Sequence, residues 1–485
     1  MRAQGPGCLT RLGLPHKGMS ILPATGASFA AETDVAVVGA GACGLVAALM
    51  AKEAGAEVLV FERDPAPQGS TAMSSGMIMA CDTRFQRAKG VADSPALMAR
   101  DILAKNKGEA DPKQVETICR ESGPAVEWLA DTHGVPLDLV QGFLYPGHSM
   151  LRMHAPPSRS GAELIGALTR AAEAAGIDIV TRAQVTALFA DGNGRVAGLR
   201  YRRPDGKEED AGCRALVLAS SGFGGNKAMV RRYIPEMADA LYFGHVGNQG
   251  DAMLWGEALG AALADMGAYQ GHGSVARPHG ALVTWALMME GGFQVNARGE
   301  RFSNEHRGYS EQAVDVIAQP GGIAWNIYDA RLDALGREFE DYRQAAAAGA
   351  VLTAPSSEAL AEKAGLPPQA LARTIGAVAA LARGEGRDPF GRDFSAKPAL
   401  APPYHAIRVT GALFHTQGGL VVDETARVLR KDGSRLPNLF AGGGAARGIS
   451  GAHVWGYLSG NGLLPAVTLG RIAGREAARL VTARI

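Results

Sequence analysis

The sequence predicts an α/β protein built on a Rossmann-like nucleotide-binding domain that a second domain interrupts. Residues 34–61 read as strand, glycine-rich turn, helix and strand, which is the order of a βαβ unit. A glycine-rich strand–turn–helix texture returns after Gly411, whereas residues 270–408 mix helical segments with many prolines. Because the two glycine-rich parts are alike and the middle differs, we expect the first domain to be discontinuous.

These changes in glycine and proline content and in the predicted elements set the expected domain bounds. The nucleotide-binding domain is expected over residues 33–269 and 409–485, and the inserted domain over residues 270–408. Glycine and proline interrupt every apolar run in residues 1–32, which predicts a disordered lead and not a secretory signal.

The individual elements follow from apolar runs and their breakers. Residues 34–38 and 57–61 are short apolar runs typical of strands, and residues 45–54 form a good helical segment that Gly55 ends. The further expected elements are a loop over 65–75, helices over 94–133 and 161–175, and strands over 178–189, 196–201 and 215–219.

Composition excludes several classes of function. The chain has 485 residues, with 49 basic and 48 acidic side chains and a net charge of +1, which argues against a nucleic-acid binder or a polybasic membrane-surface protein. The longest uncharged stretch, residues 448–470, is rich in glycine and also contains proline and histidine, so no membrane span is expected. The five cysteines form no CxxC pair or Cys/His cluster, so we expect neither a disulfide framework nor a metal site. We therefore predict a cytoplasmic protein.

The glycine motif indicates a dinucleotide site. Gly39, Gly41 and Gly44 form G-x-G-x-x-G between a strand and a helix, where glycines allow a tight turn, close approach of a pyrophosphate and close helix–strand packing. Glu62 follows at the end of the next strand, where a carboxylate can accept hydrogen bonds from ribose hydroxyls.

Two further segments favour FAD over NAD. Residues 68–79 (QGSTAMSSGMIM) form a small-residue loop suited to wrapping around a pyrophosphate and ribityl chain. Near the C-terminus, an apolar run over 436–440 leads into Gly442–Gly444, and a second glycine-rich turn enters a helix over 459–469. The N-terminus of that helix can stabilise negative charge on a reduced flavin, although the same pattern also suits a structural strand–helix junction.

At this point the chain resembles the FAD-dependent fumarate reductase/succinate dehydrogenase flavoprotein superfamily, and above all its soluble fumarate reductases and its 3-ketosteroid dehydrogenases. The resemblance runs from about Thr33 to Ala478. It implies an FAD-binding domain of the GR2 type with an inserted α+β capping domain, and a substrate held between them. The motifs that carry it are VVGAGACG (37–44), SSGFGGN (220–226), GHVGNQGD (244–251), YQGHG (269–273), GERFSNE (299–305), FHTQGGLVVD (414–423) and LFAGG with SGNGLL and GRIAG (439–474).

The resemblance also implies the residues that bind FAD. Covalent attachment in this family uses a histidine in the loop after the acidic strand, and none occurs between Glu62 and Ala80, so we expect non-covalent FAD. The expected cofactor-binding residues are Gly39, Gly41, Gly44, Glu62, Arg63, Ser70, Thr71, Ser75, Gly76, Val185, Gly222, Asp251, Gly442, Gly443, Ser459, Gly460, Asn461 and Leu463.

Four residues are implied at the substrate. His272 and His415 match the two substrate-binding histidines of the resembling fumarate reductases. Tyr309 and Tyr457 stand where the ketosteroid dehydrogenases have tyrosines that handle the proton and the carbonyl. A phenol, with a pKa of about 10, can act as that acid or base if its surroundings help.

The chain departs from the fumarate reductases at three places. Tyr309 replaces their proton-donating arginine, and Met288 and Trp285 replace the arginine and glutamate that relay protons to it. Residues 450–459 lack the arginine that clamps the substrate. The residues near enough in sequence to substitute for it are Arg307, Arg447 and His453.

Two charged groups have open interpretations. Arg301 and Glu305 flank the site motif and form either part of the site or a structural ion pair. Residues 147–161 gather basic side chains that either line an entrance for anions or cap the next helix, namely Arg152, His154 and Arg159.

Together these features predict an FAD-dependent oxidoreductase that moves a hydride between flavin N5 and a CH–CH or C=C pair beside a carbonyl or carboxylate. A fumarate-type dicarboxylate reductase and a flavin-bearing electron-transfer subunit are the alternatives. No haem-attachment CxxCH occurs, so a separate electron donor or acceptor is expected beside a small-molecule substrate.

Overall fold

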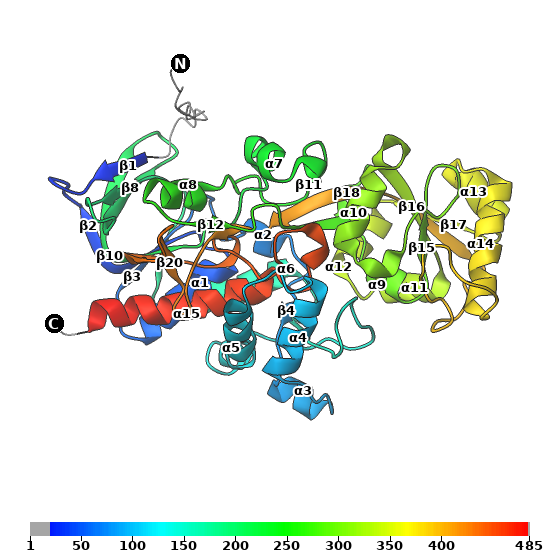
Figure 1. Ribbon diagram of the computed structural model, residues 1–485, viewed down its shortest axis with the longest axis horizontal. Helices are drawn as coiled ribbons and strands as arrows, with labels where there is room; N and C mark the ends of the chain where they lie inside the picture. Colours follow the sequence, from blue (N-terminus) through cyan, green and yellow to red (C-terminus); the bar gives the residue numbers. More distant parts are fainter. Residues whose placement is uncertain (1–19, 484–485) are drawn as a thin grey trace, which may run out of the picture.

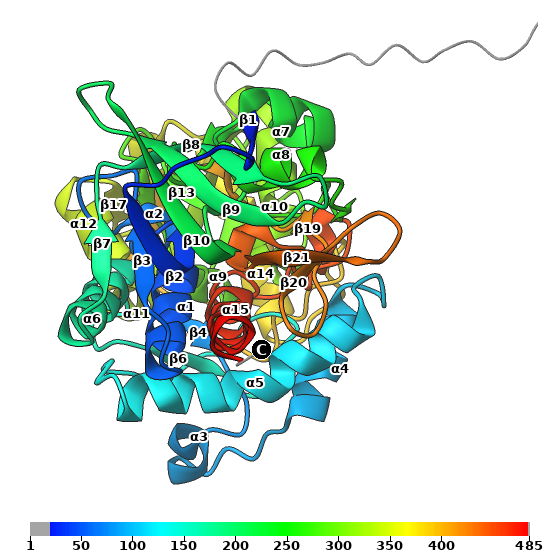
Figure 2. The same cartoon turned by 90° about the vertical axis from the view of Figure 1, so that its left-hand side faces the viewer.

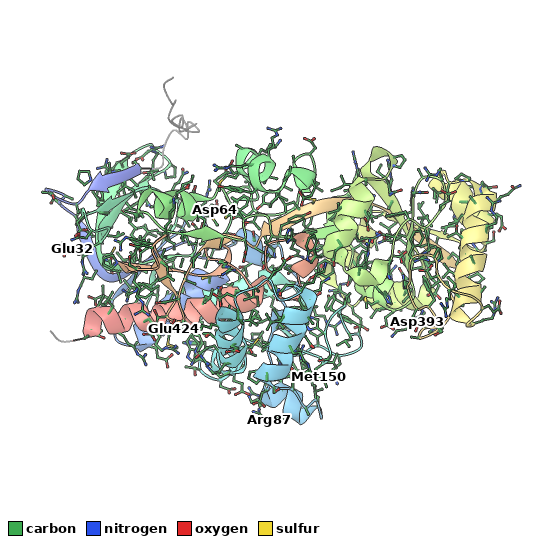
Figure 3. The ribbon with its side chains drawn as sticks, viewed as in Figure 1. Glu32, Asp64, Arg87, Met150, Asp393 and Glu424 are labelled. Carbon is green, nitrogen blue, oxygen red and sulfur yellow. The ribbon has the colours of Figure 1, made fainter. Side chains whose placement is uncertain are left out.

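The computed structural model describes residues 20–483 and has two main sheets, which lie toward opposite ends of an elongated molecule (Figure 1). Figure 3 labels Glu32 at the end that carries the larger sheet and Asp393 toward the end that carries the smaller one. We call the part around the smaller sheet the cap.

The larger sheet has nine strands in the order β1-β8-β9-β10-β2-β3-β7, with β21 also on β10 and β20 on β21. Its centre is parallel, since β2, β3, β7, β10 and β21 run the same way, so their carboxyl ends meet at one edge. The bounds are β1 Ser20–Pro23, β2 Ala31–Val38, β3 Val58–Phe61, β7 Asp178–Val180, β8 Gln184–Ala190, β9 Val196–Arg202, β10 Glu208–Leu218, β20 Arg427–Leu429 and β21 Arg435–Ala441.

Two helices from opposite ends of the sequence cover one face of this sheet. Figure 2 looks along α15 (Leu463–Thr482) and shows it beside α1 (Ala42–Glu53). The helices approach closely because α15 carries Gly470 and Gly474, where added Cβ atoms would lie 2.6 Å from the carbonyl oxygen of Cys43 and 2.2 Å from that of Ala47. Residues 42–51 of α1 are all buried as a result.

The cap is built on a seven-stranded sheet in the order β14-β13-β18-β16-β15, with β11 and β17 also on β18. Its longest strand, β18 (Tyr404–Thr416), pairs with β13 (Tyr269–Ala276) so that Gln270 lies opposite His415. The remaining cap strands are β11 Leu241–Tyr242, β14 Ala281–Leu282, β15 Phe293–Val295, β16 Ile323–Asp329 and β17 Val351–Ala354, and its helices are α9 Ala286–Met289, α10 Tyr309–Ile317, α11 Ala330–Gly336, α12 Glu340–Ala347, α13 Ser357–Ala364 and α14 Pro368–Ala382.

Smaller elements complete the fold around the two sheets. They are α2 Gly69–Ala72, β4 Ile78–Met79, α3 Arg84–Ala88, α4 Pro95–Lys105, α5 Pro112–Asp131, β5 Asp138–Leu139, β6 Met153–Ala155, α6 Gly161–Ala174, α7 Lys227–Tyr233, α8 Asp251–Ala258, β12 Leu263–Ala264 and β19 Gly419–Leu420. None of the helices within residues 20–483 combines the length and apolar character needed to cross a bilayer.

Several expected elements differ from the structure. Residues 20–23 form β1, an edge strand paired with β8, so the disordered lead predicted for residues 1–32 is wrong there; residues 1–19 lie outside the described residues. The strand predicted over 178–189 is two strands, because a turn with Arg182 at φ 52° separates β7 from β8. The last helix begins at Leu463, so Ser459 to Gly462 remain in the preceding turn. The domain bounds stay a prediction, although β18 extends across the expected boundary at residue 409.

Candidate active site

A large cavity opens at the carboxyl edge of the parallel strands, where ligands of doubly wound folds usually bind. It holds about 1810 Å³ of empty space, part of it open to solvent. Its walls include the residues that directly follow β2, β3 and β10, namely Gly39, Glu62 and Ala219, together with residues of the cap such as Tyr309. The cavity therefore lies where the two sheet regions meet.

The turn between β2 and α1 is shaped for a phosphate group. Gly39 has φ +102°, and an added Cβ there would lie 2.6 Å from the carbonyl oxygen of Ala219. A Cβ on Gly44 would lie 1.8 Å from the carbonyl oxygen of Gly39, so both positions need glycine. Helix α1 starts after Gly41, which offers no side-chain cap, so N–H groups of its first turn remain available to an anion.

The acidic residue lies beside this turn. The Glu62 carboxylate accepts hydrogen bonds from the N–H groups of Ala40 (2.8 Å) and Asp64 (2.9 Å). Burial raises its pKa, and these two N–H groups oppose the rise. Thr71 accepts a hydrogen bond from the N–H of Ala42 at 3.0 Å, which joins the small-residue loop to the start of α1.

Most of the predicted cofactor residues line the cavity. Four glycines instead support its wall from behind, where added Cβ atoms would meet neighbouring atoms at 1.8 to 2.7 Å: Gly44, Gly76, Gly222 and Gly442. The predicted residues in the wall itself are Gly39, Gly41, Glu62, Arg63, Ser70, Thr71, Ser75, Val185, Asp251, Gly443, Ser459, Gly460, Asn461 and Leu463.

Three polar atoms on cavity-lining residues show that the cavity suits a polar cofactor. Ser220 Oγ, Trp255 Nε1 and Asn461 Oδ1 are buried without a hydrogen-bond partner, although such atoms almost always have one. Together with the first-turn N–H groups of α1 that Thr71 does not bind, they fit a long molecule with phosphate and hydroxyl groups. The residues present therefore fit FAD.

The other end of the cavity is aromatic. The predicted residues Tyr309, Tyr457 and His415 all line it. The rings of Tyr309 and Tyr457 lie 6.0 Å apart and those of His415 and Tyr457 lie 5.6 Å apart, measured between centroids. Burial, followed by the neighbouring Tyr457, raises the pKa of Tyr309 well above its ordinary value, so its hydroxyl stays protonated at neutral pH.

His415 is a neutral hydrogen-bond donor at this end. Burial lowers its pKa to about 4. The Gln417 side-chain amide lies 3.2 Å from its Nδ1 and can only donate there, whereas the competing contact of Nδ1 with the carbonyl oxygen of Thr416 is longer, 3.5 Å. The shorter contact favours the tautomer with the ring proton on Nε2. An added Cβ on Gly462 would lie 2.7 Å from Nε2, so the missing side chain of that glycine makes room for the imidazole.

His272 lies behind the wall and not in it. Its ring stacks on Tyr309 with 4.7 Å between centroids and an angle of 26°, and its Nδ1 accepts a hydrogen bond from the N–H of Ser274. Burial lowers its pKa to about 3, so it is neutral. In this position His272 supports the Tyr309 ring, and the direct substrate contact that the family resemblance implied stays a prediction.

Sequence reasoning missed the aromatic residues that complete this end. Tyr145 comes from the segment between β5 and β6, and its ring lies 6.3 Å from that of Tyr309. No motif marks that segment, so nothing local identified it. Phe414 also lines the cavity and directly precedes His415. Strand alternation would place these two neighbours on opposite faces, and the irregular register of β18 with β13 at this point removes that signal. Leu282 and Phe243 add further apolar wall.

The basic residues considered as substitutes for the missing clamp are paired elsewhere and do not line the cavity. Arg307 pairs with Asp315 on the surface. Arg447 pairs with Asp265 at 2.6 Å. The third, His453, lies 2.9 Å from Glu109 and is half exposed.

The other two charged groups are structural. Arg152 is fully buried between Asp93 (2.7 Å) and Asp101 (2.5 Å), so it does not line an entrance for anions. Ser160 caps the next helix, so Arg152 does not cap it. Both interpretations of residues 147–161 are therefore wrong for Arg152. In the same segment, the ring of His154 forms a hydrogen bond with Thr83, and Arg159 forms an ion pair with Glu338.

Arg301 and Glu305 form a buried ion pair at 2.8 Å. Arg392 adds a second cation at 3.1 Å from Glu305, and Asp388 balances the network by pairing with Arg301. This network joins the start of α10 to the segment after α14, which favours the structural interpretation.

Comparison with known proteins places this geometry in a family. The model of the FAD binding domain matches residues 34–463. A probable fumarate reductase of Shewanella frigidimarina is 30% identical over 92% of this chain and 75% of its own length. The chain belongs to the FAD-dependent fumarate reductase/succinate dehydrogenase flavoprotein superfamily.

The flavoprotein is also similar to relatives with other names. The NADH:fumarate oxidoreductase of Klebsiella pneumoniae is 31% identical over 92% of this chain, which spans only 48% of that relative. The open conformation of a flavocytochrome c3 fumarate reductase superposes with a TM-score of 0.79 and 30% identity, over 95% of this chain and 80% of that one. A 3-ketosteroid-Δ4-(5α)-dehydrogenase from Rhodococcus jostii superposes with a TM-score of 0.73 and 26% identity, over 94% and 99%.

These comparisons confirm the α/β fold class with its capping domain and confirm FAD as the cofactor. The flavoprotein is an FAD-dependent oxidoreductase, in a family whose members act on C=C or CH–CH bonds next to a carbonyl or carboxylate.

Proposed function

We propose that this flavoprotein reduces, or in the reverse direction forms, a carbon–carbon double bond conjugated to an uncharged carbonyl group. The observation that carries the proposal is the chemistry of the cavity's aromatic end, where Tyr145, Tyr309, Tyr457 and neutral His415 supply hydrogen-bond donors. Among the described residues, no arginine or lysine lines that end of the cavity. Arg63 does line the cavity, but it follows β3 and lies on the side of the glycine turn.

FAD, when bound along the glycine turn and the loop over residues 68–79, supplies the two-electron chemistry. The Nε2–H of His415 and the hydroxyl of Tyr457 are placed to donate to the substrate carbonyl oxygen. These hydrogen bonds stabilise the negative charge that collects on that oxygen when the far carbon of the double bond receives a hydride or, in the reverse direction, when the carbon next to the carbonyl loses a proton. During reduction Tyr309 donates its hydroxyl proton to the carbon next to the carbonyl and is left as a phenolate. The reverse transfer, from that carbon to Tyr309 during desaturation, starts from the phenolate, which the raised pKa of Tyr309 disfavours.

The same geometry disfavours a dicarboxylate. A buried carboxylate without a cationic partner is strongly destabilised, and fumarate would bring two. The candidate replacements for the clamp, Arg307 and Arg447, are already paired outside the cavity. Fumarate reduction remains the second candidate because of the named relatives, and an electron-transfer subunit without its own chemistry is the third.

The experiment is an anaerobic comparison of oxidants. The flavin is first photoreduced, and reoxidation is then followed by absorbance after addition of a cyclic conjugated ketone or of fumarate. We expect the ketone to reoxidise the flavin faster than fumarate does. Faster reoxidation by fumarate would favour the dicarboxylate reductase, and no response to any unsaturated ketone or acid would favour the electron-transfer subunit.

We further propose that FAD is held without a covalent bond and that a separate carrier exchanges electrons with it. The support is that no histidine lies between Glu62 and Ala80 and that the sequence has no CxxCH. Acid precipitation tests the first point, because non-covalent FAD appears in the supernatant and covalent FAD stays with the protein.

We also propose a cytoplasmic location. The four described cysteines are buried and free, which a reducing compartment maintains: Cys43, Cys81, Cys119 and Cys213. Fractionation of cells that express the chain tests this proposal.

A further inference from the structure

Helix α10 begins with the residue that we assign to proton transfer. Tyr309 is its first residue, and Gly308 precedes it at φ 141° without a side-chain cap. The start of the helix must therefore be held by other contacts. Ser310 supplies one of them, since its Oγ accepts a hydrogen bond of 2.7 Å from the N–H of Gly271, which lies on β13 of the same cap sheet.

Glu311 supplies a contact of a different kind. Its Oε1 forms an ion pair with Lys105, the last residue of α4, and the Lys105 ammonium also donates to the carbonyl oxygen of Arg307 at 2.8 Å. The side chains of Lys105 and Glu311 are only 13% and 14% exposed, so water screens this pair less than it screens a surface pair.

The carboxylate of Glu311 folds over the start of its own helix. An added Cβ on Gly308 would lie 2.5 Å from Oε2, and this oxygen is buried without a hydrogen-bond partner. A negative charge at a helix N-terminus is favourable. Burial raises the pKa of Glu311 and Lys105 opposes that rise, so the lysine helps to keep the carboxylate charged.

The pair also connects two parts of the molecule. Helix α4 packs on α5, which packs on α15, and both lie below the middle of the molecule in Figure 1, whereas α10 packs on β13 and β18 in the cap. Ser310 therefore fixes α10 within the cap, and Lys105 fixes it to the part that holds the cofactor turn. A proton donor must be within hydrogen-bond reach of its target, so the second connection sets the geometry that matters for catalysis.

We propose that Lys105 and Glu311 are positioning residues that clamp the start of α10 and thereby hold the Tyr309 hydroxyl over the substrate. This role rests on the proposed function of Tyr309. The clamp itself is a structural statement and can be tested without any substrate.

The test compares Lys105→Met with a matched control, Lys397→Met. Lys397 also pairs with a carboxylate, Glu290 at 2.7 Å, and neither residue of this pair belongs to α4 or α10. Amide hydrogen exchange of the FAD-loaded proteins is measured by mass spectrometry. We expect exchange in residues 308–313 to be about tenfold faster or more in Lys105→Met and unchanged in Lys397→Met.

Kinetics then connect the clamp to catalysis. In Lys105→Met we expect kcat to fall about 10- to 100-fold with little change in KM, and the solvent deuterium isotope effect on kcat to rise, because proton transfer becomes slower. Lys105→Arg keeps the charge and is expected to recover most of kcat. If Lys105→Met does not fold, Glu311→Gln removes the same ion pair with almost no change of shape.

Two results would overturn the proposal. One is wild-type exchange in residues 308–313 of Lys105→Met or of Glu311→Gln. The other is a Lys105→Met protein whose residues 308–313 exchange faster but whose kcat and isotope effect equal those of the wild type, in the case where Tyr309→Phe reduces turnover. A Tyr309→Phe variant with wild-type turnover would instead refute the proposed function, while the exchange data would still decide whether the clamp exists.

Discussion

Replacing Tyr309 by phenylalanine removes one oxygen atom and leaves the ring in place. The ring contacts that hold it, with His272 at 4.7 Å and with Trp285 and Tyr145 at 6.3 Å, do not depend on the hydroxyl. The hydroxyl itself faces Ser459 and Tyr457, so its loss removes neutral hydrogen bonds to two neighbours. We therefore expect the free energy of unfolding to fall by only about 1–2 kcal/mol.

The expected effect on turnover is much larger. General acid–base catalysis by a positioned side chain contributes about 10²- to 10⁴-fold, which corresponds to about 2.7–5.5 kcal/mol of activation free energy. The loss should therefore appear in kcat while FAD content and melting temperature stay close to wild type. Anaerobic single-turnover reoxidation of the reduced enzyme by its substrate measures the step directly.

Tyr328→Phe is the matched control. It makes the same chemical change at another buried tyrosine, whose hydroxyl bonds to Tyr342 at 2.8 Å within the cap. We expect its turnover to equal that of the wild type. Turnover of Tyr309→Phe within about threefold of the control would refute Tyr309 as the proton-transfer group.

Three further predictions follow from the same geometry. Gly44→Ala is expected to purify with little FAD, judged by the ratio of visible to ultraviolet absorbance, because its Cβ would lie 1.8 Å from the carbonyl oxygen of Gly39. Burial opposes the charge of Glu305, but two neighbouring arginines outweigh it and hold its pKa at about 2. Because the pKa of Glu305 is lower in the folded than in the unfolded protein, its charge stabilises the fold fully above the unfolded pKa of about 4.5, and this stabilisation is lost as pH falls toward 2. Glu305→Gln should therefore lower the free energy of unfolding by about 3 kcal/mol in denaturant titrations at pH 7. On acidification the variant should lose less stability than the wild type does. His272 and His415, with pKa values of about 3 and 4, are neutral from pH 5 to 8. Substrate affinity, followed by flavin absorbance, should therefore show no histidine titration in that range, and a step near pH 6.5 would contradict this.

The nucleotide end of the site could be predicted from sequence because its requirements are local. A tight turn and a close helix–strand contact demand glycine at fixed spacing, and Gly39 and Gly44 meet that demand in the structure. The short edge strand β1 could not be predicted, because its partner β8 lies more than 160 residues further along the chain.

At the substrate end, the sequence identified only the residues that belong to recognisable local motifs. Tyr309 and His415 belong to recognisable motifs, and both line the cavity. Tyr145 belongs to no motif and reaches the cavity only because the segment between β5 and β6 folds against the cap. His272 does belong to a motif, yet its ring stacks on Tyr309 behind the wall, since β13 and β18 pair with irregular register on either side of it.

The contact between α1 and α15 bears on how the protein is made. Helix α1, which presents its first turn to the cofactor, leaves the ribosome long before α15, whose Gly470 and Gly474 seat it against α1. Until α15 has been synthesised, the nascent chain exposes the apolar side of α1 and lacks one wall of the nucleotide turn. We therefore expect FAD to be captured only after α15 has emerged, and chaperones have that interval in which to shield the exposed surface.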